Sequence, residues 1–176
     1  IAEKNNKKIA IVGSGPSGLA CAEKLIELGY DVDVYDKYHK EGGILTYGIP
    51  DFVLAKDIVD NKINYLKKLG VNFLLNMEMN VDFTLETLKE KYDAIYLAFG
   101  AGKAKKMNVK NNEINGIIDA NLFLMKVYEN DIKEFENCND VIVVGGGNTA
   151  IDAALVAKNK LNKNVTIVYR RSEKEM

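Results

Sequence analysis

Two glycine-rich segments hold the residues whose types and spacing suit chemistry. The first is Gly13-Ser14-Gly15-Pro16-Ser17-Gly18, and the second is Gly145-Gly146-Gly147-Asn148-Thr149-Ala150. Each follows a short apolar run and opens a stretch with helical spacing. In such a motif the first glycine allows a tight turn, the second lets the backbone approach a pyrophosphate, and the third position lets the helix lie against the strand. Two motifs, 132 positions apart (145 − 13), predict two dinucleotide sites between which electrons pass.

The helix that follows each turn strengthens the predicted phosphate site. Its first turn offers free N–H groups and a partial positive charge, and both favour an anion. In the second motif Gly145 and Gly147 take the first two glycine positions and Ala150 takes the third. The predicted contacts of the two turns are Gly13, Ser14, Gly15, Pro16, Ser17 and Gly18 in the first, and Gly146, Gly147, Asn148 and Thr149 in the second.

The end of the next strand distinguishes the two sites. Asp36 lies 18 positions after Gly18 (36 − 18), where an acidic side chain accepts hydrogen bonds from the ribose of FAD or of NAD. The matching place after the second motif holds Arg170 and Arg171, with no carboxylate until Glu173. Guanidinium groups bind a 2′-phosphate bidentately, whereas carboxylates repel it. We therefore predict NADP(H) at the second site; the alternative is that the two arginines are merely solvated.

The elements that must position these residues alternate between strands and helices. Apolar runs predict strands at 9–12, 32–35, 71–75, 94–98, 141–144 and 165–169. Helical spacing predicts helices at 16–28, 52–69, 84–91 and 120–128, with another after the second motif; 37–50 and 101–116 are expected to be loops and 130–140 a linker. This alternation predicts an α/β fold of Rossmann-like, doubly wound parallel sheets with helices on both faces.

Composition excludes several classes of function. The chain has 176 residues and a formal net charge of −1, so no strong field directs it to nucleic acid or anionic lipid. No apolar run is long enough to cross a bilayer. Two distant cysteines, Cys21 and Cys138, make neither a disulfide framework nor a metal cluster, and a reducing cytoplasm fits them best. His39 and the basic run at 103–106 are interpreted as solvated loop residues.

Two further segments carry a resemblance to a known family. They are Gly42-Gly43-Ile44-Leu45-Thr46-Tyr47-Gly48-Ile49-Pro50, and the tail from Val165 to Met176 together with Gly145 to Asp152. They resemble the small (beta) subunit of NADPH-dependent glutamate synthase. Related flavoproteins have the same segments: the large subunit of NADH-dependent ferredoxin:NADP oxidoreductase and the N-terminal part of dihydropyrimidine dehydrogenase.

The resemblance implies which cofactor each turn holds. FAD is expected at the first motif, with Asp36, Gly43 and Ile44 in contact and Met79 near the adenine; Gly100, after the strand at 94–98, joins this set. NADPH is expected at the second motif and at the paired arginines. The domains implied are an incomplete FAD-binding domain at 1–138 and the first βαβ unit of an inserted NADP-binding domain at 139–176.

The implied reaction is hydride transfer from NADPH to FAD, and then electron transfer to iron–sulfur centres or a partner subunit. No catalytic acid–base pair is expected, because the cofactors carry this chemistry. Iron–sulfur clusters are expected only outside this sequence. The alternatives are another member of the superfamily, with ferredoxin or a pyrimidine as final partner, and a non-catalytic nucleotide-binding assembly subunit.

The sequence departs from the family in three ways. Val53 and Ala55 stand where the family often has a basic residue and a proline. The family's cysteine-rich iron–sulfur segment, which precedes the position of Ile1, is missing. The rest of the NADPH domain and the C-terminal segment that closes the FAD site are also missing. The piece is therefore expected to be inactive alone. It also has no cysteine in the loop 37–50 and no cysteine pair before the second motif, so a dithiol enzyme such as thioredoxin reductase is disfavoured.

Overall fold

The structure is a computed structural model, and it describes residues 2–103, 110 and 114–175. Most of the basic run at 103–106 and much of the expected loop at 101–116 lie outside the described residues. Contacts divide the chain into two compact units, one of residues 1–46 and 54–102 and the other of residues 47–53 and 103–176. The cofactor-based division at 138/139 remains a prediction.

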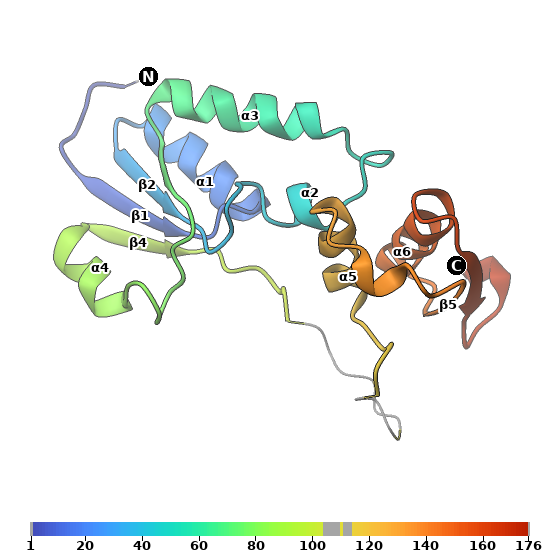
Figure 1. The fold of residues 1–176 in the computed structure, drawn as a ribbon. Helices are drawn as coiled ribbons and strands as arrows, with labels where there is room; N and C mark the ends of the chain where they lie inside the picture. The colour runs from blue at the N-terminus through green and yellow to red at the C-terminus, as the bar shows by residue number, and fades with distance from the viewer. Residues whose placement is uncertain (1, 104–109, 111–113, 176) are drawn as a thin grey trace. The chain divides into compact units, whose positions relative to one another are not determined.

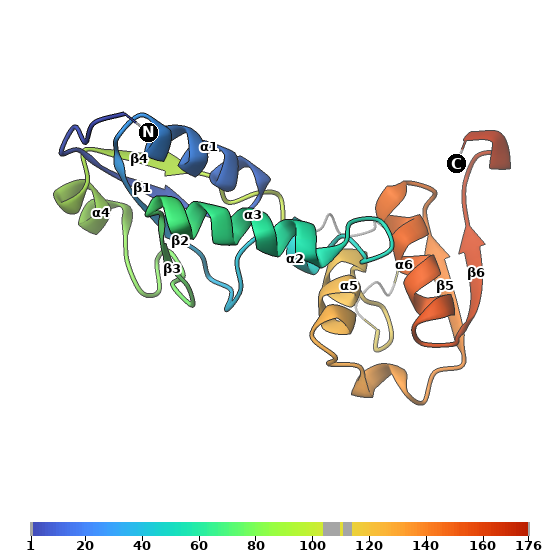
Figure 2. The same ribbon diagram turned by 90° about the horizontal axis from the view of Figure 1, so that it is seen from above.

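The first unit is a four-stranded parallel sheet with helices on both faces, in the strand order β3-β2-β1-β4 (Figures 1 and 2). Its strands are β1 (Lys8–Val12), β2 (Asp31–Tyr35), β3 (Asn72–Leu74) and β4 (Ala94–Leu97). Its helices are α1 (Pro16–Glu27), α2 (Ile44–Tyr47, whose last residue belongs to the second unit), α3 (Lys56–Leu69) and α4 (Leu85–Lys91). The predicted α/β class and parallel sheet are confirmed.

The two central strands are buried almost throughout because helices cover both of their faces. One face, with Ile11 and Val34, packs under α1 and α3, and the other, with Ala10 and Tyr35, packs against α4. Figure 1 shows α1 and α3 on one side of the sheet and α4 on the other. This packing fixes the carboxyl ends of β1 and β2 next to each other, where the first glycine turn begins.

Local turn chemistry moved one predicted boundary and added one short helix. The third helix begins at Lys56 rather than at residue 52, because the Val53 N–H bonds to the Pro50 carbonyl and closes a turn there. It ends as expected at Gly70, which is left-handed with φ 104°. The predicted loop at 37–50 contains the short helix α2, which the sequence analysis did not anticipate.

The second unit repeats the strand–turn–helix–strand pattern on a smaller scale. It holds α5 (Ala120–Tyr128), a 3₁₀ turn (Lys133–Phe135), β5 (Asp140–Val144), α6 (Asn148–Asn159), β6 (Asn164–Val168) and a 3₁₀ turn (Glu173–Glu175). β5 and β6 pair in parallel, and α6 packs on them and on α5 through Phe123, Val156 and Ala157. Among the residues that the structure describes, no helix combines the length and apolarity that crossing a membrane requires.

Candidate functional site

Two glycines of the first turn lie where no side chain fits. Gly13 has φ 110°, and a Cβ there would lie 2.2 Å from the Ala98 carbonyl oxygen. A Cβ on Gly18 would lie 1.9 Å from the Gly13 carbonyl oxygen. The chain turns out of β1 at Gly13, whose N–H donates to the Tyr35 carbonyl at 2.8 Å, and α1 lies directly against that turn. These positions therefore have the turn and close-packing roles predicted for them.

Gly15 differs from both because its surroundings are open. It is the N-cap of α1, and a Cβ added to it would meet no atom within 4 Å. The first turn of α1 contains no acidic residue, and Pro16 occupies its first position. The N–H groups of that turn have no intrahelical partner, so they and the helix dipole favour an anion at this opening. The turn therefore fits the pyrophosphate of FAD, the group implied for it.

The glycine loop before α2 lies directly beside this opening. A Cβ on Gly43 would lie 3.0 Å from the Gly15 Cα. Glu41, at the start of this loop, is buried and fixes the loop to α3. Its Oε1 forms an ion pair with Lys67 of α3 at 2.6 Å, without the geometry of a hydrogen bond. The Thr46 hydroxyl donates to the Glu41 carbonyl at 2.6 Å. The resemblance placed Gly43 at FAD, and the structure brings it to the turn.

Asp36 lies at the end of β2, next to the turn, and only 8% of it is exposed. Its Oδ2 accepts hydrogen bonds from the Ser14 N–H at 2.8 Å and the Ser14 hydroxyl at 2.5 Å. Its Oδ1 accepts one from the Tyr38 N–H at 3.0 Å. The carboxylate is thus anchored within the fold as well as placed at the predicted ribose position.

The other residues assigned to the first site are less closely gathered. Ile44 is 52% exposed at the start of α2. Met79 is half-buried against the cluster that contains Tyr35 and Phe83, beyond the end of β3. Gly100 follows β4 and is exposed, with φ 70°. The Ser17 hydroxyl lies 2.9 Å from the hydroxyl of Tyr96 on β4.

The second turn has the same design as the first. Gly145 has φ 131°, and its N–H donates to the Val168 carbonyl at 3.0 Å. Gly147 is the N-cap of α6, again without an acidic residue in the first turn, and no atom lies within 4 Å of an added Cβ. The helix N-terminus formed by Gly147, Asn148 and Thr149 is therefore open to a phosphate, which fits the NADPH implied here.

Gly146 has a role that the sequence analysis missed. A Cβ on it would lie 2.8 Å from the ring of Tyr169, the first residue after β6. The Tyr169 hydroxyl donates to the Glu175 carbonyl at 3.1 Å. The ring is thus positioned by this hydrogen bond and by its packing against Gly146. The only sequence signal was an aromatic residue at the end of the next strand, opposite the middle one of three consecutive glycines. Gly146 thus packs the turn against the second strand and leaves the open approach to Gly147.

Arg170 and Arg171 follow at the same edge of the sheet. The register pairs Val144 with Val168, so the second turn and the two arginines leave the carboxyl ends of adjacent strands. Both arginines are exposed, and neither side chain has a hydrogen bond or ion pair to any residue that the structure describes. They are the only two arginines in the sequence.

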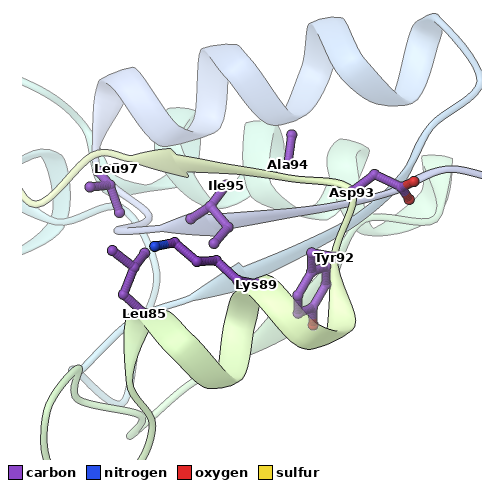
Figure 3. A pocket seen from close by; sticks show the side chains of 7 residues that line it. All are labelled: Leu85, Lys89, Tyr92, Asp93, Ala94, Ile95 and Leu97. Carbon is purple, nitrogen blue, oxygen red and sulfur yellow. The ribbon is translucent and has the colours of Figure 1, made fainter.

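The first unit also has a hollow away from the glycine turn. It has a volume of about 360 Å³ and lies between α4 and β4, lined by Leu85, Lys89, Tyr92, Ile95 and Leu97 among others (Figure 3). None of the predicted cofactor residues lines it. Within the described ranges no group of His, Cys, Asp and Glu is placed to hold a metal ion, and His39 is exposed in its loop.

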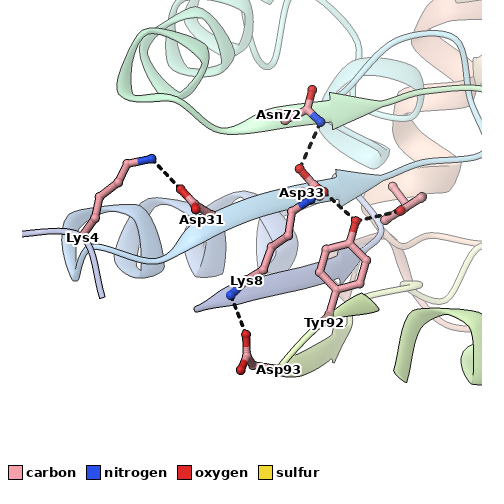
Figure 4. Close-up of polar contacts among 8 residues, drawn as sticks. Lys4, Lys8, Asp31, Asp33, Asn72, Tyr92 and Asp93 are labelled. Atoms are coloured by element: carbon pink, nitrogen blue, oxygen red, sulfur yellow. Dashed lines mark hydrogen bonds and ion pairs between the residues drawn. The ribbon is translucent and has the colours of Figure 1, made fainter. Parts of the chain in front are cut away.

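A buried polar cluster lies on the α4 side of the sheet (Figure 4). Asp33 of β2 accepts hydrogen bonds from the Tyr92 hydroxyl at 2.5 Å and from Asn72 at 3.0 Å, and Lys8 lies 2.9 Å away. The Tyr35 and Tyr92 hydroxyls are 2.8 Å apart. Burial acts to raise the pKa of Asp33, but the hydrogen bonds from Tyr92, Lys8 and Asn72 outweigh it and lower that pKa. Burial, with the bond to Asp33, raises the pKa of Tyr92.

The fold and the two turns define a Rossmann-like α/β protein, and comparison with known proteins gives its family. The family model described as pyridine nucleotide-disulphide oxidoreductase matches residues 7–174. The chain belongs to that family of oxidoreductases.

Named relatives agree with the predicted resemblance. The chain is 37% identical to the glutamate synthase [NADPH] small chain of Bacillus subtilis, over 93% of this chain and 35% of that protein. It is 38% identical to the NADPH-Fe(3+) oxidoreductase subunit beta of Geobacter sulfurreducens, over 98% of this chain and 26% of that one. The resemblance is confirmed, and the chain spans about a third of the length of these relatives or less.

A solved structure of an oxidoreductase also matches the fold of this chain. Mycobacterium tuberculosis FprA in complex with NADPH matches with a TM-score of 0.74 and 26% identity, over 85% of this chain and 36% of that one. Lactococcus lactis thioredoxin reductase matches at 18% identity with a TM-score of 0.61, which shows a shared fold.

Proposed function

We propose that this chain is the dinucleotide-binding part of an oxidoreductase that takes a hydride from NADPH onto FAD. One observation carries the proposal: Gly15 and Gly147 are both N-caps in extended conformation, with no side-chain cap and open space where a Cβ would stand. Each unit thus has its own phosphate opening. The relatives named for NADPH chemistry support the same assignment.

The first unit supplies the FAD contacts. The N–H groups at the start of α1 would bind the pyrophosphate, with Asp36 facing the ribose and the loop at Gly42 and Gly43 alongside. FAD, when bound, supplies a flavin that accepts a hydride and releases electrons. The protein's part in this chemistry is to bind and orient the two cofactors, because the cofactors carry the hydride chemistry.

The second unit supplies the NADPH contacts. The opening at Gly147 would bind the pyrophosphate. The guanidiniums of Arg170 and Arg171, which have no hydrogen bond or ion pair to any described residue, would bind the 2′-phosphate bidentately. A carboxylate at this strand end would repel the same group. The arrangement therefore favours NADPH over NADH.

The final acceptor lies with the longer protein or a partner. The relatives include a small chain and a subunit beta, which supports electron transfer to a partner subunit or to iron–sulfur centres. The two cysteines are free thiols, which is consistent with the reducing cytoplasm that we propose as the location.

The test is the cofactor content of the full-length protein. The protein should purify yellow, or take up FAD when it is added, to one flavin per chain. A protein that stays colourless after incubation with FAD would support the non-catalytic assembly subunit instead.

A further inference from the structure

The side chain of Ser14 faces the interior of the fold rather than the phosphate opening. It is fully buried, with 0% exposure, although it lies between the two glycines of the first turn. Its hydroxyl donates to Oδ2 of Asp36 at 2.5 Å and accepts from the Gly42 N–H at 3.1 Å. One hydroxyl therefore connects the turn to the end of β2, 22 positions further along the chain, and to the glycine loop, 28 positions further along.

These contacts limit what Asp36 can still accept. A carboxylate has about four lone-pair positions, two on each oxygen. Ser14 fills both positions on Oδ2, through its N–H and its hydroxyl, and the Tyr38 N–H fills one on Oδ1. One position remains, on Oδ1. A ribose presents two hydroxyls, and the anchored carboxylate has room for only one of them.

The Gly42 contact adds a second effect of the same hydroxyl. The Gly42 N–H donates to the Ser14 carbonyl at 3.2 Å as well as to its hydroxyl, which keeps the loop over the turn. Gly43, the next residue, is the one whose backbone lies against Gly15. Loss of the hydroxyl therefore loosens the loop beside the phosphate opening and frees Oδ2 of Asp36.

We propose that Ser14 is a positioning residue that reserves Oδ1 of Asp36 for a single ribose hydroxyl of the dinucleotide. The inference rests on the proposed function, because it takes FAD to be the ligand of the first turn. It adds that recognition of the adenosine ribose at this site depends on one of its two hydroxyls.

The experiment compares FAD with two analogues that lack either the 2′- or the 3′-hydroxyl of the adenosine. Dissociation constants are measured by flavin fluorescence on the full-length protein after removal of its cofactor. In the wild type, one analogue should bind about 10-fold more weakly than FAD and the other within about 2-fold, as expected for loss of one hydrogen bond to a charged group. Equal weakening by both deletions would overturn the proposal.

Ser14→Ala removes the hydroxyl that holds Oδ2 toward the interior, so the Asp36 carboxylate can rotate and present both of its oxygens to the two ribose hydroxyls. FAD should bind more weakly, and the ratio between the two analogues should fall toward 1. If the affinity falls equally for FAD and both analogues and the ratio between the analogues stays at its wild-type value, the role of Ser14 is only structural and the proposal is overturned. Ser14→Cys, which keeps the size with a weak donor, gives the same test if the alanine variant does not fold.

Tyr92→Phe is the matched control, because it removes another hydroxyl that donates at 2.5 Å to a buried aspartate of β2, Asp33. It should lower stability and leave the analogue ratio at its wild-type value. A wild type that binds neither FAD nor the analogues refutes the proposed function itself, an outcome distinct from binding without hydroxyl discrimination.

Discussion

Gly15 and Gly18 are three positions apart and have opposite surroundings, so the same substitution should act differently at each. Gly18→Ala puts a Cβ 1.9 Å from the Gly13 carbonyl oxygen and should prevent stable folding of the unit. Gly15→Ala meets no atom of the protein. It should change the free energy of unfolding by no more than about 1 kcal/mol, yet weaken FAD binding roughly 10-fold or more by filling the phosphate opening.

Thermal denaturation and flavin titration of the two variants measure these effects. Gly147→Ala is the matched variant of the second turn and should weaken NADPH binding while leaving FAD affinity unchanged. Equal FAD affinity for wild type and Gly15→Ala would show that the opening does not bind the pyrophosphate.

A second prediction concerns the paired arginines, Arg170 and Arg171. Arg170→Glu with Arg171→Glu should weaken NADPH binding by about 100-fold and leave NADH binding nearly unchanged, since only NADPH has the 2′-phosphate. Titration with each nucleotide gives the two dissociation constants. The control is Lys133→Glu with Lys158→Glu, which makes the same change of charge at two exposed residues of the same unit, away from the strand end. It should leave the preference for NADPH over NADH intact. Unchanged discrimination in the arginine variant would refute the 2′-phosphate assignment.

Among the elements, β2 carries a buried aspartate, Asp33, at its centre, and a second buried aspartate, Asp36, follows its last residue. Asp33 is held by Tyr92, Asn72 and Lys8 on the α4 side. Tyr92→Phe leaves this carboxylate short of a donor and should cost about 1–3 kcal/mol of unfolding free energy, measured by urea denaturation. A change below a few tenths of a kcal/mol would show that the cluster does not stabilise the sheet.

The same cluster predicts a dependence on pH. The pKa of Asp33 is lowered in the folded state, because hydrogen bonds to the carboxylate outweigh its burial. A group with a lowered folded pKa stabilises the fold above its unfolded pKa of about 3.9, and this contribution is lost as pH falls through the folded value. Stability should therefore fall below about pH 4 in the wild type and less steeply in Asp33→Asn. Parallel pH profiles for the two would contradict this assignment.

Sequence pattern predicted the elements better than their connections. The apolar runs and glycines gave each strand and long helix within a few residues, because burial on both faces requires continuous apolar strands. The short helix α2 and the turn at Pro50 were missed, since they depend on a local backbone bond and not on periodicity. The Ser14–Asp36 and Gly146–Tyr169 contacts were missed because they join segments that only the folded chain brings together.

For the molecule as a whole, we propose that each of the two units binds one dinucleotide. Each has a glycine turn that opens a helix, and a strand end beside that turn: Asp36 follows β2 in the first unit, and Arg170 and Arg171 follow β6 in the second. Variants in one unit should therefore affect one dinucleotide and spare the other.

Anaerobic titration of the full-length, FAD-loaded protein with NADPH tests the central claim most directly. We predict that about one equivalent of NADPH bleaches the visible absorbance of the flavin, and that NADH does so far less readily. A flavin that stays oxidised under excess NADPH would contradict it.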